Sequence, residues 1–162
     1  MNRVVIIIAL LFSFPALGQQ PQWPSLKDTL ESALDEDNPE VSKQIYLYQR
    51  CAANRLAIGA VLKEANASLA EKYDQSSSVL AQAAAIKRMM LAVERTGQQP
   101  DVAEIGESTK KVVISLYEQY QAWLNNNYLL NGSYFENDSD FQLEMEICGL
   151  ATQLASSLIA EP

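Results

Sequence analysis

Apolar residues recur every three or four positions along most of the chain, which is the spacing that places side chains on one face of an α-helix. Four long stretches follow this spacing, at residues 40–73, 79–95, 101–130 and 140–160. No segment alternates apolar and polar residues over the length of a strand with turns around it. The pattern therefore predicts an all-α protein with about four main helices.

Turn-forming and capping residues lie at most of the predicted helix ends. The polar run at 74–78 indicates a break between the first two stretches, although the two could also form one continuous helix. Gly97 suits the left-handed position that follows many helices, and the Asn-Gly pair at 131–132 ends the next stretch. Ser139, with Gln142 three residues later, forms a capping box that is expected to begin the last helix.

A short N-terminal helix is also predicted ahead of the four long ones. Ser25 is a suitable N-cap for residues 26–34, whose leucines share one helical face, and the acidic run at 35–38 ends this helix. Because the connections are short, neighbouring helices are expected to be antiparallel, which predicts an up-and-down helical bundle. An irregular array of helices is the alternative.

The last predicted helix has the widest apolar surface in the chain. Two neighbouring faces are mainly apolar, one with Phe141, Met145, Cys148, Thr152, Ala155 and Ile159, the other with Leu143, Ile147, Leu150, Leu154 and Leu158. A helix with two such faces is expected to be buried on two sides of the bundle.

The first 18 residues have the order of a secretory signal peptide. Arg3 precedes an uncharged apolar run at 4–14, and Ala16 and Gly18 stand at the −3 and −1 positions of a cleavage site. The apolar run is shorter than the roughly 20 residues that span a bilayer, and no later segment is apolar enough to do so. We therefore expect cleavage after Gly18, export to the periplasm or the secreted space, and no membrane span in the mature protein.

The expected mature chain, residues 19–162, is read as a single helical domain whose first residues, 19–24, form an extended leader with two prolines. Its net charge is strongly negative, since the −8 of the whole chain becomes −9 when Arg3 is removed. Phosphate backbones repel such a chain, which excludes nucleic acid as a ligand and fits a cationic exported protein as a partner. The sequence indicates no particular oligomeric state.

The chain has two cysteines, Cys51 and Cys148. Each lies on or beside the apolar face of a long predicted helix, so that the two can face each other across a bundle. An even number of cysteines in an exported chain favours disulfide formation, because the compartment is oxidising. The sequence therefore predicts a Cys51–Cys148 disulfide.

Histidine is absent from the chain, which excludes many catalytic and metal sites. Ser-His-Asp and Cys-His catalysis both need a histidine, as do His-ligated zinc and the Glu-x-x-His di-iron site of helical bundles. Paired carboxylates can run glycoside hydrolysis without one. Four glutamates are candidates for that role, although no recognisable motif surrounds them: Glu104, Glu107, Glu144 and Glu146. We therefore predict no catalytic residue, no metal and no cofactor.

The acidic segment at 136–140 superficially resembles a calcium-binding loop. An EF-hand loop starting at Glu136 would need Gly at its sixth position and Glu at its twelfth, where the chain has Phe141 and Ile147. The segment is therefore interpreted as a negatively charged helix start. Three Asn-x-Ser patterns, which accept N-glycans only in a eukaryotic secretory pathway, begin at Asn66, Asn131 and Asn137.

Aromatic residues are concentrated in the third long stretch and in the first. The residues concerned are Tyr117, Tyr120, Trp123 and Tyr128, together with Tyr46 and Tyr48. Rings at these positions could line a ligand cleft or a partner surface. The simpler interpretation is core packing at helical spacing, with the hydroxyl tips reaching water.

These observations favour a non-enzymatic interaction or structural module of the periplasm or secreted space. The acidic segment 35–40 or the loop 134–140 is expected to contact its cationic partner. One alternative is an acid-responsive periplasmic chaperone, since the mature chain would change from about −9 towards +11 as its carboxylates are protonated below roughly pH 4. The other alternative is a carboxylate-based hydrolase acting on cell-wall or sugar substrates.

Overall fold

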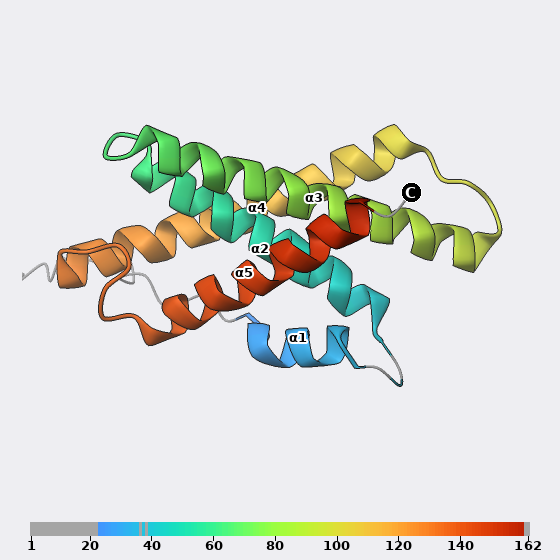
Figure 1. Ribbon diagram of the computed structural model, residues 1–162, viewed down its shortest axis with the longest axis horizontal. Coiled ribbons are helices and arrows are strands. Elements are labelled where there is room, and N and C mark those ends of the chain that lie inside the picture. Colours follow the sequence, from blue (N-terminus) through green and yellow to red (C-terminus); the bar gives the residue numbers. More distant parts are fainter. Residues whose placement is uncertain (1–22, 36, 38, 161–162) are drawn as a thin grey trace, which may run out of the picture.

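The protein is built from helices joined by short connections, as the computed structural model in Figure 1 shows. The structure describes residues 23–35, 37 and 39–160. Within them 82% of residues are helical and no strand occurs, which confirms the all-α prediction and is compatible with a helical bundle. The helices are α1 (Leu26–Ala33), α2 (Val41–Leu62), α3 (Ala67–Thr96), α4 (Val102–Asn131) and α5 (Ser139–Ala160).

The predicted signal peptide at 1–18 and the first part of the predicted leader, 19–22, lie outside the described residues. The end of the leader, Trp23 and Pro24, is non-helical as expected. Trp23 nevertheless packs against the apolar core and donates a hydrogen bond from its Nε1 to Oε1 of Gln119 on α4, at 2.9 Å. None of the helices that the structure describes has an apolar stretch long enough to cross a membrane.

Helix α2 lies at the centre of the molecule and packs against α1, α3, α4 and α5. Every residue from 47 to 55 is buried, whichever side of the helix it faces. The apolar stripe in the sequence predicted burial of one face only. Full burial places polar residues of α2 inside the protein, and Arg50, Asn54 and Arg55 are among them.

Helices α2 and α3 form the closest helix pair in the structure. Gly59 makes this approach possible, because a Cβ atom there would lie only 3.3 Å from the backbone oxygen of Ala70. Ser77 strengthens the contact by donating a hydrogen bond from its hydroxyl to the backbone oxygen of Ala52, at 2.8 Å. The pair therefore forms a tight hairpin on which the other helices pack.

Helices α4 and α5 are neighbours in the sequence but are not packed backbone to backbone. Within the described residues, no Cα atoms of these two helices lie within 8 Å of each other. Both pack on α2 and α3 instead, and α5 also contacts α1. Large side chains fill the space between them, including Tyr120 and Trp123 of α4 and Phe141 of α5. This space contains the candidate site described below.

The helix break predicted at 74–78 is wrong. Helix α3 runs without interruption through this segment, and the break lies earlier, at 63–66. Asn66 begins α3 as its N-cap, since its side chain accepts a hydrogen bond from the backbone N–H of Leu69 at 3.0 Å. The serines at 76 and 78 each donate a hydrogen bond to a carbonyl one turn earlier, which lets them remain within a helix.

Other predicted helix ends are confirmed, with one change of capping residue. Gly97 and Gly132 end α3 and α4 in the left-handed conformation, with φ of 67° and 72°. At the start of α5 the expected cap was Ser139, but Asp138 takes that role by accepting a hydrogen bond from the backbone N–H of Phe141 at 2.9 Å. A carboxylate at this position also interacts favourably with the helix dipole.

Burial of α5 on two sides is also wrong. The face with Cys148 packs inward, but Leu143 and Leu150 on the other face are 44% and 52% exposed, and only Ile147 is buried there. The reason is that α1, the helix lying against this side of α5, has only eight residues and is too short to cover the whole face. The C-terminal part of α3 is also left uncovered by other helices, since Met90 is 53% exposed there.

Replacing Asn66 with alanine should lower the free energy of unfolding by about 1 kcal/mol, because it removes the N-cap of α3. Urea denaturation of the disulfide-bonded protein measures this difference. Ser78→Ala is the matched control, since Ser78 is exposed within α3 and bonds only to its own helix. A loss for Ser78→Ala as large as that for Asn66→Ala would contradict the position of the break.

Candidate functional site

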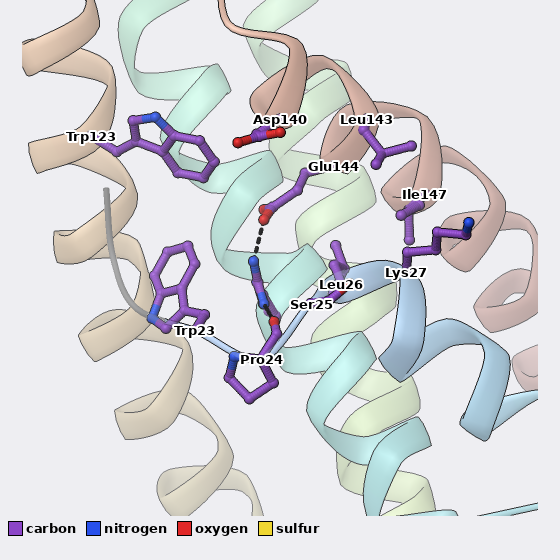
Figure 2. Close-up of a pocket in the computed structure, with 11 residues that line it drawn as sticks. Trp23, Pro24, Ser25, Leu26, Lys27, Trp123, Asp140, Leu143, Glu144 and Ile147 are labelled. Carbon is purple, nitrogen blue, oxygen red and sulfur yellow. Dashed lines mark hydrogen bonds and ion pairs between the residues drawn. The ribbon is translucent and has the colours of Figure 1, made fainter. Parts of the chain in front are cut away.

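A cavity of about 350 Å³ lies where the start of α1 meets α4 and α5 (Figure 2), and Arg50 of α2 also lines it. Two tryptophans, Trp23 and Trp123, line it together with two carboxylates, Asp140 and Glu144. We call it the tryptophan cavity. Its size falls within the usual range for small-molecule sites, which begins at about 300 Å³.

Two residues that line the tryptophan cavity, Arg50 and Glu144, belong to a closed set of hydrogen bonds with Tyr120. Arg50 donates from Nη2 to one oxygen of Glu144, and the Tyr120 hydroxyl donates to the other oxygen. Arg50 also donates from Nε to the Tyr120 oxygen, at 3.1 Å. The side chains of Arg50 and Glu144 are only 3% and 9% exposed, so this is a buried ion pair.

The segment before α1 closes the cavity over Arg50. The guanidinium carbon of Arg50 lies 4.4 Å from the centre of the Trp23 ring, and Arg50 donates from Nη1 to the backbone oxygen of Pro24. A cation over an indole face is attracted to it. Two residues of the predicted leader therefore complete the site, which its proline-rich sequence did not indicate.

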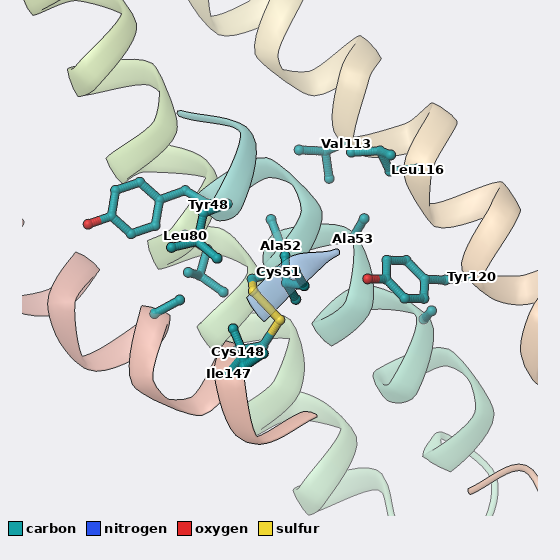
Figure 3. Close-up of a cluster of buried hydrophobic side chains, with 14 of the residues drawn as sticks. Tyr48, Cys51, Ala52, Ala53, Leu80, Val113, Leu116, Tyr120, Ile147 and Cys148 are labelled. Carbon is teal, nitrogen blue, oxygen red and sulfur yellow. A yellow bond between two sulfur atoms is a disulfide. The ribbon is translucent and has the colours of Figure 1, made fainter. Parts of the chain in front are cut away.

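The predicted aromatic cluster is divided between separate places. Tyr120 and Trp123 lie beside the cavity, where the Trp23 ring is 4.6 Å from that of Tyr120. Tyr48 points away from Tyr120, on the other side of the core around the disulfide (Figure 3). Tyr128, at the end of α4, stacks on a loop tyrosine at a centroid distance of 4.6 Å and is 48% exposed.

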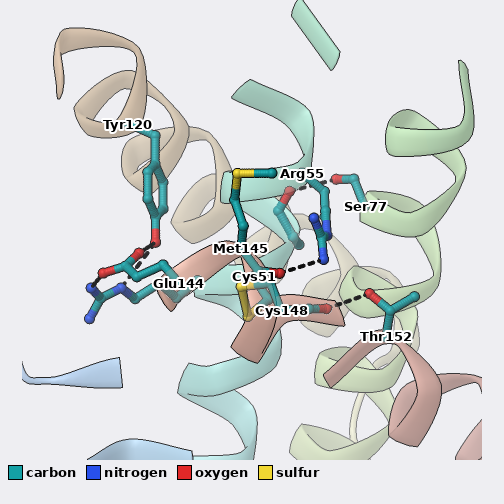
Figure 4. The surroundings of a disulfide bond; sticks show 10 residues. Cys51, Arg55, Ser77, Tyr120, Glu144, Met145, Cys148 and Thr152 are labelled. Atoms are coloured by element: carbon teal, nitrogen blue, oxygen red, sulfur yellow. Dashed lines mark hydrogen bonds and ion pairs between the residues drawn. A yellow bond between two sulfur atoms is a disulfide. The ribbon is translucent and has the colours of Figure 1, made fainter. Parts of the chain in front are cut away.

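The Cys51–Cys148 disulfide is confirmed, with a Cα–Cα distance of 5.0 Å (Figure 4). Cys51 follows Arg50 on α2, and Cys148 lies one helical turn after Glu144 on α5. The covalent link therefore holds α5 at the depth that brings Glu144 to Arg50. About one helical turn after Cys51 on α2, Arg55 donates a hydrogen bond to the backbone oxygen of Met145 at 3.0 Å. This bond fixes the same part of α5.

Burial governs the protonation of these groups. It raises the pKa of Glu144, and the opposing effects of the Arg50 charge and of the hydrogen bonds from Tyr120 and Arg50 offset it only in part. Burial, and then the charge of Glu144, raise the pKa of Tyr120 well above its ordinary value, so the phenol stays protonated. For Arg50, burial lowers the pKa, but Tyr120 and Glu144 outweigh it and keep the guanidinium charged.

Only one of the four candidate glutamates reaches the cavity. Glu144 lines it, whereas Glu104, Glu107 and Glu146 are exposed elsewhere on α4 and α5. Asp140 is the second carboxylate of the cavity and was missed. Its position four residues before Glu144 could have indicated this, because residues at that spacing share a helix face.

The predicted contact loop at 134–140 borders the cavity through Asp140. Asp138 supports the wall from behind, since its Oδ2 accepts a hydrogen bond from Trp123 Nε1 at 2.7 Å. The chain has no Lys or Arg between residues 112 and 162, so the basic residues that line the cavity, Lys27 and Arg50, come from α1 and α2. The described part of the other candidate segment, 35–40, does not line this cavity.

In the part of the chain that the structure describes, no group of three or more His, Cys, Asp or Glu residues is placed to hold a metal ion. Comparison of the chain with protein-family models, with curated proteins and with solved structures found no match. The function has therefore to be argued from the chemistry of the site itself.

Proposed function

We propose that the protein is an exported, non-enzymatic interaction module that binds a cationic protein in the periplasm or secreted space. The observation that supports this is the tryptophan cavity, where the Asp140 carboxylate lies at the rim beside two indole rings. Lys27 of α1 lines the same cavity, but α5, the helix that carries Asp140, has no Lys or Arg. A Lys or Arg side chain of the partner would meet the Asp140 carboxylate and an indole face there, a combination that attracts cations.

The state of Glu144 favours binding over catalysis. Both of its oxygens accept hydrogen bonds from inside the protein, one from Arg50 and one from Tyr120. A general acid or nucleophile needs an oxygen directed at its substrate. Leu143, which also lines the cavity and is 44% exposed, adds apolar surface for a partner to cover.

Export is supported by the disulfide, because such bonds persist in oxidising compartments and are rare in the cytosol. The predicted signal peptide at 1–18 agrees with this, and both belong to the proposal. A bundle with a covalent link beside its site is also rigid there, which lowers the entropy lost on binding.

Neutralising the rim with Asp140→Asn should weaken partner binding by at least tenfold. The matched control is Glu104→Gln, which removes the same charge from the exposed first turn of α4. Cross-linking in the native host, followed by affinity purification with the disulfide intact, should recover the same basic protein with wild type and control. Recovery should be lost with the rim variant and at about 1 M salt, where the Debye length is about 3 Å.

One observation favours the hydrolase alternative, namely that Asp140 and Glu144 line the same cavity. Two carboxylates flanking a bond are the usual catalytic pair of glycoside hydrolases. If no basic protein is recovered, and the purified protein releases sugars from cell-wall material while folded Glu144→Gln does not, the interaction proposal is wrong. Equal recovery with the rim variant and the control would also contradict it.

A further inference from the structure

A second cavity lies on another side of the molecule, between the end of α1, α2, α3 and α5, and encloses about 250 Å³. Its walls are mainly apolar and include Leu34, Leu47, Leu154 and Leu158. Gln44 fixes one wall, since its Nε2 donates a hydrogen bond to the backbone oxygen of Ala33 at 2.8 Å and holds the end of α1 against α2. We call it the leucine cavity. It shares no lining residue with the tryptophan cavity.

Tyr48 places a hydroxyl in this apolar surrounding. The residue is only 6% exposed and lines the leucine cavity, yet its hydroxyl makes no hydrogen bond within the described part of the chain. Figure 3 shows the hydroxyl pointing away from the core, between α3 and α5. Burial raises the pKa of Tyr48, so the hydroxyl stays protonated and is a donor. The hydroxyl oxygen is not among the fully buried unpaired atoms of the described residues, so an acceptor on a ligand in the cavity can reach it.

Among the described residues, Lys87 is the one charged residue that lines the leucine cavity. It is half-buried on α3 and pairs with no carboxylate among the residues that the structure describes. A positive charge without a partner is unexpected in a chain of net charge −8. Together, Lys87 and the Tyr48 hydroxyl offer a charge and a donor to an anionic group, while the leucines offer apolar walls.

We infer that the leucine cavity binds a small amphipathic carboxylate, of the class of medium-chain fatty acids. The carboxylate lies between Lys87 and the Tyr48 hydroxyl, and the alkyl chain lies along Leu47, Leu154 and Leu158. Because the volume is below the roughly 300 Å³ at which small-molecule pockets usually begin, the ligand is short, of about ten carbons or fewer. The inference does not depend on the proposed partner of the tryptophan cavity.

Isothermal titration of the disulfide-bonded protein with straight-chain carboxylates of six to twelve carbons tests the walls. Affinity should rise about fourfold for each added methylene group. It should stop rising once the cavity is full. An affinity that rises steadily to twelve carbons without levelling off would indicate adsorption to exposed surface and would overturn the inference.

The head group is tested with decanoate, decanol and decyltrimethylammonium, each below its micellar concentration. Decanoate should bind at least tenfold more tightly than the other two. Lys87→Met should remove that preference while leaving decanol binding unchanged, and Tyr48→Phe should weaken decanoate binding severalfold. Lys111→Met is the matched control, because Lys111 is exposed on α4 and does not line this cavity.

Leu154→Trp provides a second test in case Lys87→Met does not fold. Leu154 is 36% exposed at the cavity, and a tryptophan ring there should fill the cavity. This variant should lose decanoate and decanol binding alike while keeping the helical circular dichroism spectrum of wild type. Decanol binding as tightly as decanoate would overturn the inference. So would an unchanged decanoate affinity in folded Lys87→Met or Leu154→Trp.

Discussion

Replacing either cysteine with serine should lower the free energy of unfolding by up to about 4.7 kcal/mol. The two cysteines are 97 positions apart, and closing a loop of about 100 residues removes that much conformational entropy from the unfolded chain in the loop-closure model. Both residues are fully buried, and each serine also places a hydroxyl in the core. Removal of the link should in addition loosen α5 next to the Arg50–Glu144 pair.

Urea denaturation of Cys51→Ser, Cys148→Ser and the double variant measures the effect. All three should lose nearly the same stability, because any one of the changes removes the same covalent link. The reduced wild-type protein is the control that separates the link from the serine hydroxyls. Equal midpoints for reduced and oxidised wild type would show that the disulfide contributes nothing to stability.

The disulfide and several helix ends could be predicted because each depends on local or simple information. Cys51 and Cys148 form the only possible intramolecular pair in the chain, and both lie on apolar helical stripes. Gly97 and Gly132 are read directly, since a left-handed helix end favours glycine over other residues. Such features need no knowledge of how the helices are arranged.

The break between α2 and α3 was misplaced because two polar signals competed. Three consecutive serines looked like a turn, but their hydroxyls bond to helix carbonyls or to α2. In the sequence, the actual start, Asn66, stands out only as the first residue of an Asn-x-Ser pattern. Its capping role depends on one hydrogen bond to Leu69, which a single asparagine in a helical stretch does not reveal.

The candidate site was largely missed because its members are far apart in the sequence. Arg50 would be placed at the surface by any hydrophobic pattern, and its partner Glu144 is 94 positions away. Full burial of α2 follows from the arrangement of four helices around it, which the stripe on α2 does not encode. The role of Trp23 could not be predicted either, because it depends on where the leader meets α4.

Glu144→Leu should lower the free energy of unfolding by about 3 to 5 kcal/mol, because it leaves Arg50 as a buried charge without a counter-ion. The Tyr120 hydroxyl would lose its acceptor at the same time. Glu144→Gln should lose less, since the amide can still accept a hydrogen bond. Glu146→Gln is the control on the same helix, because Glu146 is exposed, and its effect should be close to zero.

The pH dependence of stability follows from the raised pKa of Glu144. A raised value means that the folded protein favours the protonated carboxyl more than the unfolded chain does. The contribution of Glu144 is therefore fully present below the ordinary carboxyl pKa of about 4.3, and it declines as pH rises through the folded-state pKa. The stability of wild type relative to Glu144→Gln should fall over that window. The titration of this carboxyl therefore does not favour unfolding in acid, and it gives no support to an acid-activated chaperone.

Replacing all three polar members together, with Arg50→Met, Glu144→Leu and Tyr120→Phe, should restore stability to within about 1 kcal/mol of wild type or exceed it. Apolar side chains of similar size remove both the buried charges and the cost of burying them. Comparison of the triple variant with Glu144→Leu alone separates two quantities. One is the cost of leaving a buried charge unpaired, and the other is the contribution of the intact Arg50–Glu144 pair to the free energy of unfolding. If the triple variant is as unstable as Glu144→Leu, the three groups hold the bundle together. If it is as stable as wild type, stability does not require the pair, and partner binding by the triple variant then tests whether the pair serves to shape the tryptophan cavity.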